Sequence, residues 1–301
     1  MPTARLVVPL VLAVTFGAAL LGAGAEPSRA ACVTDDTGAQ VCLPAPPARV
    51  VSLYGAFTEL LWELGMGGAL VARTSNDDTI PEVAALPSVG TGLRPDVEHL
   101  LARRPDLVVS RGGRASQEAL SALRARGLPV AAFDPGGIGD LETVIARLGA
   151  LCGREAEGAA LVARLRERLA GVAERIGTPG RRPRVVFEVR AEPLTVAGTG
   201  GLVDEVIRRA GGINAVESDK KLLLFDVEAL LRLDPDVYVV QEGPMNRKPP
   251  ALADRAHLRL LRAARTRRVL IVDETLFSRP GPRVAEAVEH LSRFLYPERW
   301  Q

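Results

Sequence analysis

Arginine residues that directly follow apolar runs are the strongest candidates for ligand-binding residues in this sequence. In an open α/β sheet a ligand lies beyond the carboxyl ends of the strands, so residues that follow a strand can reach it. A guanidinium group is planar, and its N–H donors suit carboxylates and other anionic oxygens. The candidate arginines are Arg94, Arg111, Arg114, Arg190, Arg279 and Arg283. Together they would give one cleft a positive field, unless some face water or pair with nearby acids.

Three further side chains in such segments complete the candidate ligand site: Tyr54, Asn246 and Phe277. Aromatic residues make up only 4% of the chain, so a cleft would have few aromatic walls. Arg279 and Arg283 bracket a Pro-Gly-Pro turn that would hold them rigidly, and they are the strongest individual candidates.

Metal and nucleotide sites lack their usual patterns. The three histidines, His99, His257 and His290, lie far apart, with no Cys or His partner at ligand spacing. We therefore expect no metal site and no bound cofactor. The run Gly198-Thr-Gly-Gly201 could bind a phosphate at a helix start, but it lacks the spacing and lysine of a nucleotide loop. It fits better as a tight turn or a close approach to the ligand.

An exported α/β enzyme acting on a small anionic substrate is the alternative function. Asp134, Asp273 and Glu274 follow predicted strands, as catalytic acids often do. No Ser, His and acid set and no metal triad accompanies them, so the sequence favours a protein that is not an enzyme. A third class, a cell-surface scaffold or sensor domain, would show little cleft chemistry.

The elements that must position these side chains are short apolar runs alternating with helical stretches. The predicted strands are residues 49–53, 70–73, 107–110 and 130–133 in the first half, and 184–189, 237–241 and 269–273 in the second. This alternation is typical of α/β units on a mainly parallel sheet. We predict two lobes, each a small mainly parallel sheet flanked by helices.

A long helix is predicted between the two halves. Residues 154–176 contain no proline, and apolar residues from Leu161 to Ile176 recur at steps of three to four, which places them on one helical face. About 23 residues at 1.5 Å each span roughly 35 Å. The pattern predicts a rigid α-helix that joins the lobes, with only a small movement between empty and ligand-bound forms.

Length and charge define the organisation further. At roughly 150 residues per domain, 301 residues correspond to about two domains. The predicted division is 1–25 signal peptide, 26–48 N-terminal hairpin and proline-rich entry, 49–139 N-terminal lobe, 140–180 connecting helical segment and 181–301 C-terminal lobe. A net charge of +2 without a dense basic block argues against a nucleic-acid partner. We expect a monomer.

The N-terminus predicts export. Arg5 precedes an uncharged stretch from Leu6 to Leu21, and small residues then lead to Ala25, as in a cleavable secretory signal peptide. An uncleaved membrane anchor and a lipid-modified Cys32 are the alternatives. All three place the folded part in the periplasm or another extracytoplasmic compartment.

Two cysteines fit that oxidising compartment. Residues 36–38, Asp-Thr-Gly, suit a three-residue hairpin loop with Gly38 left-handed, and the resulting register places Cys32 opposite Cys42. We predict a disulfide between them; two unrelated cysteines are the alternative. Cys152 is left over and is expected to be a buried free thiol.

An internal repeat relates the two halves. Residues 96–109 and 226–239 align without a gap, and eight of fourteen positions are identical. Each copy predicts a short helix, a Pro-Asp turn and a buried strand. Glu98 and Glu228 lie off the apolar face and point outward. From the residues alone, a structural duplication with solvated glutamates explains them as well as a function does.

Five segments stand in a characteristic order: Pro47-Ala-Arg-Val-Val-Ser-Leu-Tyr-Gly-Ala-Phe-Thr-Glu-Leu-Leu-Trp-Glu-Leu-Gly65, Pro87-Ser-Val-Gly90, Asp96-Val-Glu98, Pro105-Asp-Leu-Val-Val109 and Ser278-Arg-Pro-Gly-Pro-Arg283. Together they resemble the substrate-binding proteins of ABC importers for iron chelates, haem and cobalamin, over roughly residues 33–297. The resemblance implies two lobes joined by a rigid helix, one ligand in the cleft, and delivery to an ABC permease dimer in the membrane. It also implies that Glu98 and Glu228 engage arginines of that permease.

The expected partner is a small-molecule metal chelate. Haem binders of this family commonly place a tyrosine or histidine after the Val-Gly of the first lobe, and here Val89-Gly90 is followed by Thr91. Cobalamin clefts need broad apolar and aromatic walls, whereas aromatic residues are only 4% of this chain. The arginines favour an anionic ferric siderophore, with a cobalamin or other corrinoid second.

Overall fold

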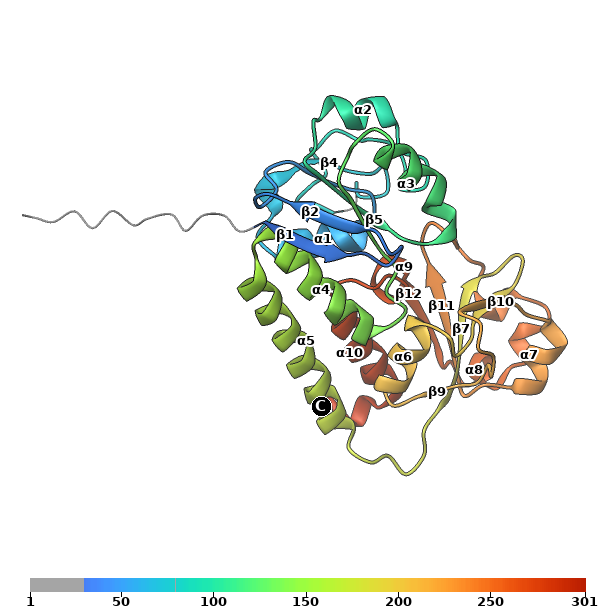
Figure 1. Cartoon of the computed structure of the whole chain (residues 1–301). Coiled ribbons are helices and arrows are strands. Elements are labelled where there is room, and N and C mark those ends of the chain that lie inside the picture. The colour runs from blue at the N-terminus through green and yellow to red at the C-terminus, as the bar shows by residue number, and fades with distance from the viewer. Residues whose placement is uncertain (1–29, 79) are drawn as a thin grey trace, which may run out of the picture.

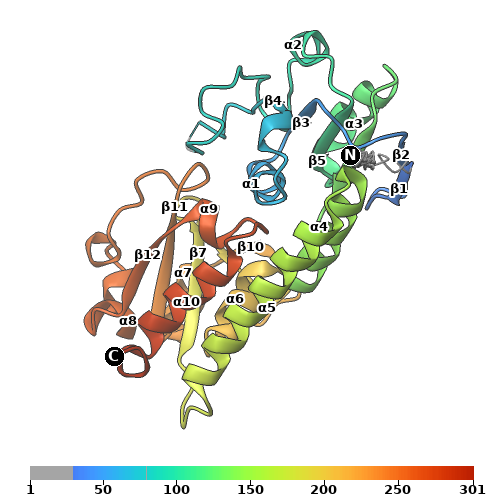
Figure 2. The same cartoon turned by 90° about the vertical axis from the view of Figure 1, so that its left-hand side faces the viewer.

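The computed structural model describes residues 30–78 and 80–301, and the predicted signal peptide lies outside this part. Two lobes, each built on its own sheet, are stacked along one long helix (Figures 1 and 2). This is the α/β architecture that the sequence predicts. Within the described ranges, no helix is long and apolar enough to span a membrane.

The first-lobe sheet has four parallel strands in the order β4-β3-β5-β6. They are β3 (Val50–Ser52), β4 (Leu70–Ala72), β5 (Leu107–Arg111) and β6 (Val130–Phe133). Helices α1 (Gly55–Glu63), α2 (Val97–Ala102) and α3 (Gln117–Arg124) belong to this lobe. The strands are buried apolar segments, as a sheet covered on both faces requires.

The second-lobe sheet has the order β10-β8-β7-β11-β12, and β9 also pairs with β7. Its strands are β7 (Arg184–Arg190), β8 (Thr195–Ala197), β9 (Ile213–Asn214), β10 (Leu222–Leu224), β11 (Val237–Glu242) and β12 (Val269–Asp273). Its helices are α6 (Leu202–Arg209), α7 (Val227–Leu233), α8 (Arg262–Arg265), α9 (Glu274–Phe277) and α10 (Val284–Leu295). All seven predicted strands are present. The short strands β8, β9 and β10 were not predicted, and β8 and β10 are antiparallel to their neighbours.

Helix α5 (Glu155–Ile176) runs along both lobes, as Figure 2 shows. Its apolar face, from Leu161 to Ile176, is buried as predicted. It packs against α4 (Ile138–Cys152) on one side and against α10 and α6 on the other. A single buried apolar cluster therefore includes Phe133 of the first lobe and Phe187 of the second.

The chain first crosses between the lobes just before α4. The Ile138 backbone N–H donates to Glu205 Oε2 of α6 at 2.7 Å, so a carboxylate of the second lobe caps this helix. A Cβ on Gly137 would lie only 2.5 Å from the same oxygen, so a larger residue there would displace this carboxylate. The crossing is thus fixed by a contact between the lobes.

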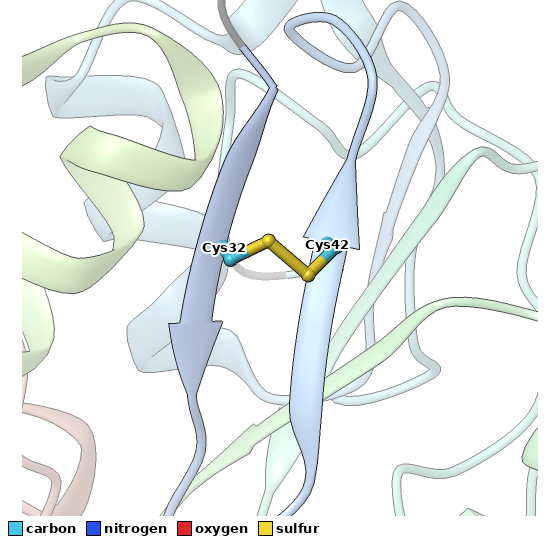
Figure 3. The surroundings of a disulfide bond; sticks show 2 residues. All are labelled: Cys32 and Cys42. Atoms are coloured by element: carbon cyan, nitrogen blue, oxygen red, sulfur yellow. A yellow bond between two sulfur atoms is a disulfide. The ribbon is translucent and has the colours of Figure 1, made fainter.

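The N-terminal hairpin consists of β1 (Ala31–Thr34) and β2 (Gln40–Leu43). Its register is the predicted one: Gly38 has a φ of +82°, and Cys32 lies opposite Cys42. The predicted disulfide joins these two residues (Figure 3). Val33 and Val41 point inward to the core and the cysteines lie on the exposed face.

The third cysteine, Cys152, is a buried free thiol at the end of α4, as predicted. Burial raises its pKa to about 12, because a thiolate would be poorly solvated there. Cys152 is therefore an unreactive core residue at neutral pH.

Candidate functional site

Two adjoining cavities of about 640 and 410 Å³ lie between the lobes. They share Asn76, Pro244 and Arg279 in their walls. Trp62 and Glu59 of α1 line the larger one, opposite segments of the second lobe. Volumes of this size are typical of pockets for small molecules. We refer to the two cavities together as the cleft.

The walls of the cleft come from the carboxyl ends of strands in both lobes. Tyr54 follows β3 and Arg111 ends β5 in the first lobe. Met245 follows β11 and Glu274 follows β12 in the second. Strand order therefore brings together side chains that lie more than 200 residues apart in the sequence.

Arg111 is oriented by two neighbours. Its Nε donates to Asp134 Oδ1 at 2.9 Å, and its guanidinium carbon lies 5.6 Å from the centre of the Tyr54 ring. Burial raises the pKa of the Tyr54 phenol, and the Arg111 and Arg279 cations oppose this effect. Tyr54 is therefore a neutral hydrogen-bond donor and apolar surface at physiological pH.

Arg279 lies where the lobes meet. It forms no ion pair with any carboxylate of residues 30–78 or 80–301. A Cβ added to Gly55 would lie 3.0 Å from its Nη1 and 2.8 Å from Asp77 Oδ1. The glycine at the start of α1 thus leaves space for a cation from one lobe and a carboxylate from the other.

Asp77 is fully buried beneath this point. Its Oδ2 accepts hydrogen bonds from the Thr74 backbone N–H at 3.0 Å and from Thr58 Oγ1 at 3.3 Å. Its Oδ1 has no partner within the described chain. Burial raises the pKa of Asp77 and of Glu59, while the Arg279 cation lowers both. In both groups the effect of burial outweighs that of the cation.

Of the predicted ligand residues, Tyr54, Arg111 and Arg279 line the smaller cavity. Arg283 lines the larger one, and its guanidinium also bonds Glu286 at 3.0 and 3.1 Å. The structure thus brings four of the nine predicted side chains to the cleft.

Phe277 and Asn246 require correction. Phe277 is fully buried, because the single turn of α9 directs it inward against Phe187 and His290. Asn246 is also buried: its Oδ1 accepts from the Ala191 N–H and its Nδ2 donates to the Gln241 carbonyl oxygen. Neither side chain faces the cleft, and Asn246 instead fastens the loop that carries Met245.

Three arginines also lie elsewhere. Arg190 donates to the Met245 carbonyl oxygen at 3.4 Å and lines a separate cavity beside Asn246. Arg94 and Arg114 are exposed and line neither cavity of the cleft. Following a strand closely was therefore not sufficient to place an arginine in the site.

The sequence interpretation missed several lining residues, above all acids. The larger cavity is lined by the acids Glu59, Glu63, Asp78, Glu82 and Asp273 and by the arginines Arg247, Arg279 and Arg283. The field of the cleft is therefore mixed, whereas a positive one was expected. Trp62 is 42% exposed, and the sequence pattern does not predict this exposure either.

Glu98 and Glu228 lie away from the cleft, in the first turns of α2 and α7. Both are exposed, and each helix begins with an aspartate whose side chain accepts a backbone N–H, Asp96 in one copy and Asp226 in the other. In Figure 1 the two helices lie at the outer side of different lobes. The repeat thus presents one exposed glutamate on each lobe.

Comparisons with known proteins agree with this architecture. Residues 50–276 match the family model described as periplasmic binding protein. An uncharacterized ABC transporter substrate-binding lipoprotein of Bacillus subtilis is 27% identical over 89% of this chain and 86% of its own length. A cobalamin-binding protein of Halobacterium salinarum is 28% identical over 86% and 72%, respectively. The crystal structure of a periplasmic haem-binding protein from Pseudomonas aeruginosa has a TM-score of 0.72 and 31% identity, covering 83% of this chain and 93% of that one.

The Asp77→Asn variant tests the burial of this carboxyl group. A raised pKa means that the folded protein favours the protonated form of Asp77. The contribution of this group to folding stability is therefore fully present below its pKa in the unfolded chain and is lost as pH rises through its pKa in the folded protein. The neutral amide keeps an oxygen for Thr74 and Thr58, and we expect Tm at pH 7 to rise by about 2 °C. Asp78→Asn, in the exposed neighbour, is the matched control and should leave Tm unchanged. A lower Tm for Asp77→Asn would contradict the assignment.

Proposed function

The chain belongs to the periplasmic binding protein family, and from this premise we propose that it captures a metal chelate in its cleft and delivers it to an ABC permease. It is a transport protein and not an enzyme. Asp134 and Glu274, which an enzyme would use as acids, are occupied as hydrogen-bond acceptors for Arg111 and for the Met245 N–H. These two carboxylates therefore orient other residues of the cleft wall.

The convergence of Arg111 and Arg279 on one cavity from opposite lobes carries the proposal for the ligand. Arg279 forms no ion pair with any described carboxylate, so its N–H groups are available to donate to a ligand oxygen. Such charge-assisted hydrogen bonds are stronger than neutral ones. We therefore favour an anionic ferric siderophore that places its carboxylate or similar oxygens between these two guanidinium groups.

A corrinoid is the second candidate. Relatives named as cobalamin-binding proteins support it, together with the apolar surface that Tyr54, Met245 and Leu93 contribute to the smaller cavity. A neutral corrinoid would use these apolar groups and would depend less on the arginines. The two candidates therefore differ in how strongly binding should respond to removal of charge.

Delivery would use Glu98 and Glu228. Two like charges on equivalent helices of the two lobes form an approximately twofold pattern, which suits a permease dimer with arginines at equivalent positions. Export by a cleavable signal peptide would bring the protein to the same side of the membrane as the ligand, in agreement with the disulfide.

Arg111→Ala and Arg279→Ala test the ligand site. Each should weaken binding of ferric citrate, our anionic chelate probe, by about 10- to 150-fold, since a hydrogen bond to a charged group contributes about 1.5 to 3 kcal/mol. Titration calorimetry measures the affinities, and Arg94→Ala is the matched control because Arg94 lies outside the cleft. If cyanocobalamin binds tightly, ferric citrate does not, and the arginine variants change nothing, the ligand is a corrinoid. Unchanged ferric citrate affinity would refute the arginine site.

Glu98→Lys combined with Glu228→Lys tests delivery. The double variant should abolish ligand uptake by cells while the affinity of the isolated protein stays at the wild-type value, because neither residue lines the cleft. Glu118→Lys with Glu217→Lys, exposed glutamates elsewhere on each lobe, is the control for altered charge. Normal uptake with the Glu98 and Glu228 reversals would rule out the docking role.

A further inference from the structure

The disulfide-closed hairpin precedes the segment that matches the family, residues 50–276, yet it contacts the first lobe near the cleft. Its turn covers the free edge of β6. The Asp36 backbone N–H donates to the Ala132 carbonyl oxygen at 2.9 Å, and Asp35 Oδ2 accepts from the Ala132 N–H at 3.0 Å. The turn therefore satisfies backbone groups that an edge strand would otherwise leave open.

The two aspartates of the turn have different tasks. The Asp35 side chain is fully buried, where it also accepts from Arg124 Nη2 at 2.5 Å and from the Thr37 and Ala39 N–H groups of the turn. It shapes the turn and holds it on the sheet. Asp36 is the residue that reaches toward the cleft.

A continuous chain of contacts runs from Asp36 to the cleft wall. Asp36 Oδ2 accepts from the Asp134 backbone N–H at 2.7 Å, and its Oδ1 lies 2.7 Å from Arg147 Nη1 of α4. Asp134 Oδ1 accepts from Arg111 Nε, and the Arg111 guanidinium lies over the Tyr54 ring. The carboxylate that orients Arg111 thus has its own backbone fixed by the hairpin.

We propose that Asp36 is a positioning residue of the ligand site: through the backbone of Asp134 it sets the direction in which Arg111 presents its guanidinium to the cleft. The ligand contact itself rests on the proposed function, whereas the orientation of Arg111 does not. The hairpin, which precedes the segment matched by the family model, then supports the binding site.

The Arg111–Asp134 ion pair needs additional support because both side chains are partly exposed to water. The Arg111 and Asp134 side chains are 44% and 31% exposed, and ion pairs this open to water contribute little by themselves. A flexible arginine side chain loses rotamer entropy when it is held in one direction. Fixing the backbone of Asp134 beforehand removes part of that cost and leaves the guanidinium preorganised for a ligand oxygen.

The test begins with the free protein, so that it does not depend on the ligand. Exchange of the Arg111 Nε–H proton with water, followed by ¹⁵N NMR and assigned with Arg111→Lys, reports the bond to Asp134. Asp36→Ala should accelerate this exchange about tenfold, because an Arg111 N–H that is held less firmly on Asp134 is exposed to water for more of the time. Asp36→Asn retains an oxygen for the Asp134 N–H and should exchange at the wild-type rate. Gln40→Ala, an exposed change in β2, is the hairpin control.

Wild-type exchange in Asp36→Ala, or acceleration in Asp36→Asn as large as in Asp36→Ala, would overturn the proposal. Ferric citrate affinity then gives a second measurement. Asp36→Ala should weaken it about tenfold in the wild-type background and not at all in an Arg111→Ala background, since coupled residues give non-additive effects. An equal loss in both backgrounds would show that Asp36 acts by another route. If ferric citrate does not bind the wild type, the proposed ligand class fails while the exchange result still decides the role of Asp36.

Discussion

The packing of α5 against both lobes is the constraint on which the rest of the structure depends. Its 22 residues extend roughly 33 Å at 1.5 Å per residue, and its buried face joins the apolar residues of both lobes into one cluster. Opening the lobes widely would expose Leu165, Leu169 and their neighbours to water, at a cost that grows with the apolar area uncovered. Binding proteins with loop hinges do not have this restraint.

A fixed arrangement of the lobes would allow the cleft to bind a ligand with few aromatic residues. Arg111 and Tyr54 on one side and Arg279 on the other already face a common space before a ligand arrives. The Glu205 contact at the start of α4 joins the two lobes, and the hairpin at β6 fixes the backbone of Asp134. Selectivity would then come from preplaced charges such as Arg111 and Arg279, and less from closure around the ligand.

The sequence predicts features that depend on local pattern. It does not predict features that depend on contacts between segments far apart in the chain. The hairpin register follows from one turn and its glycine, and the buried face of α5 from helical periodicity, so both predictions are confirmed. Phe277 was misplaced because its direction is set by a single helical turn that packs on Phe187. The acids of the larger cavity could not be recognised, because Glu59 and Asp273 come together only when the lobes are assembled.

The most direct test of a rigid two-lobed frame is the distance between the lobes in solution. Spin labels on cysteines introduced at Glu118 of α3 and Arg232 of α7, both exposed, allow pulsed electron paramagnetic resonance to measure it, since Cys152 is buried and Cys32 and Cys42 are joined. We predict one narrow distance distribution in the free protein, and a mean that shifts by less than about 2 Å when ferric citrate or cyanocobalamin is added. A broad or two-peaked distribution, or a shift of about 10 Å as in hinge closure, would contradict the account.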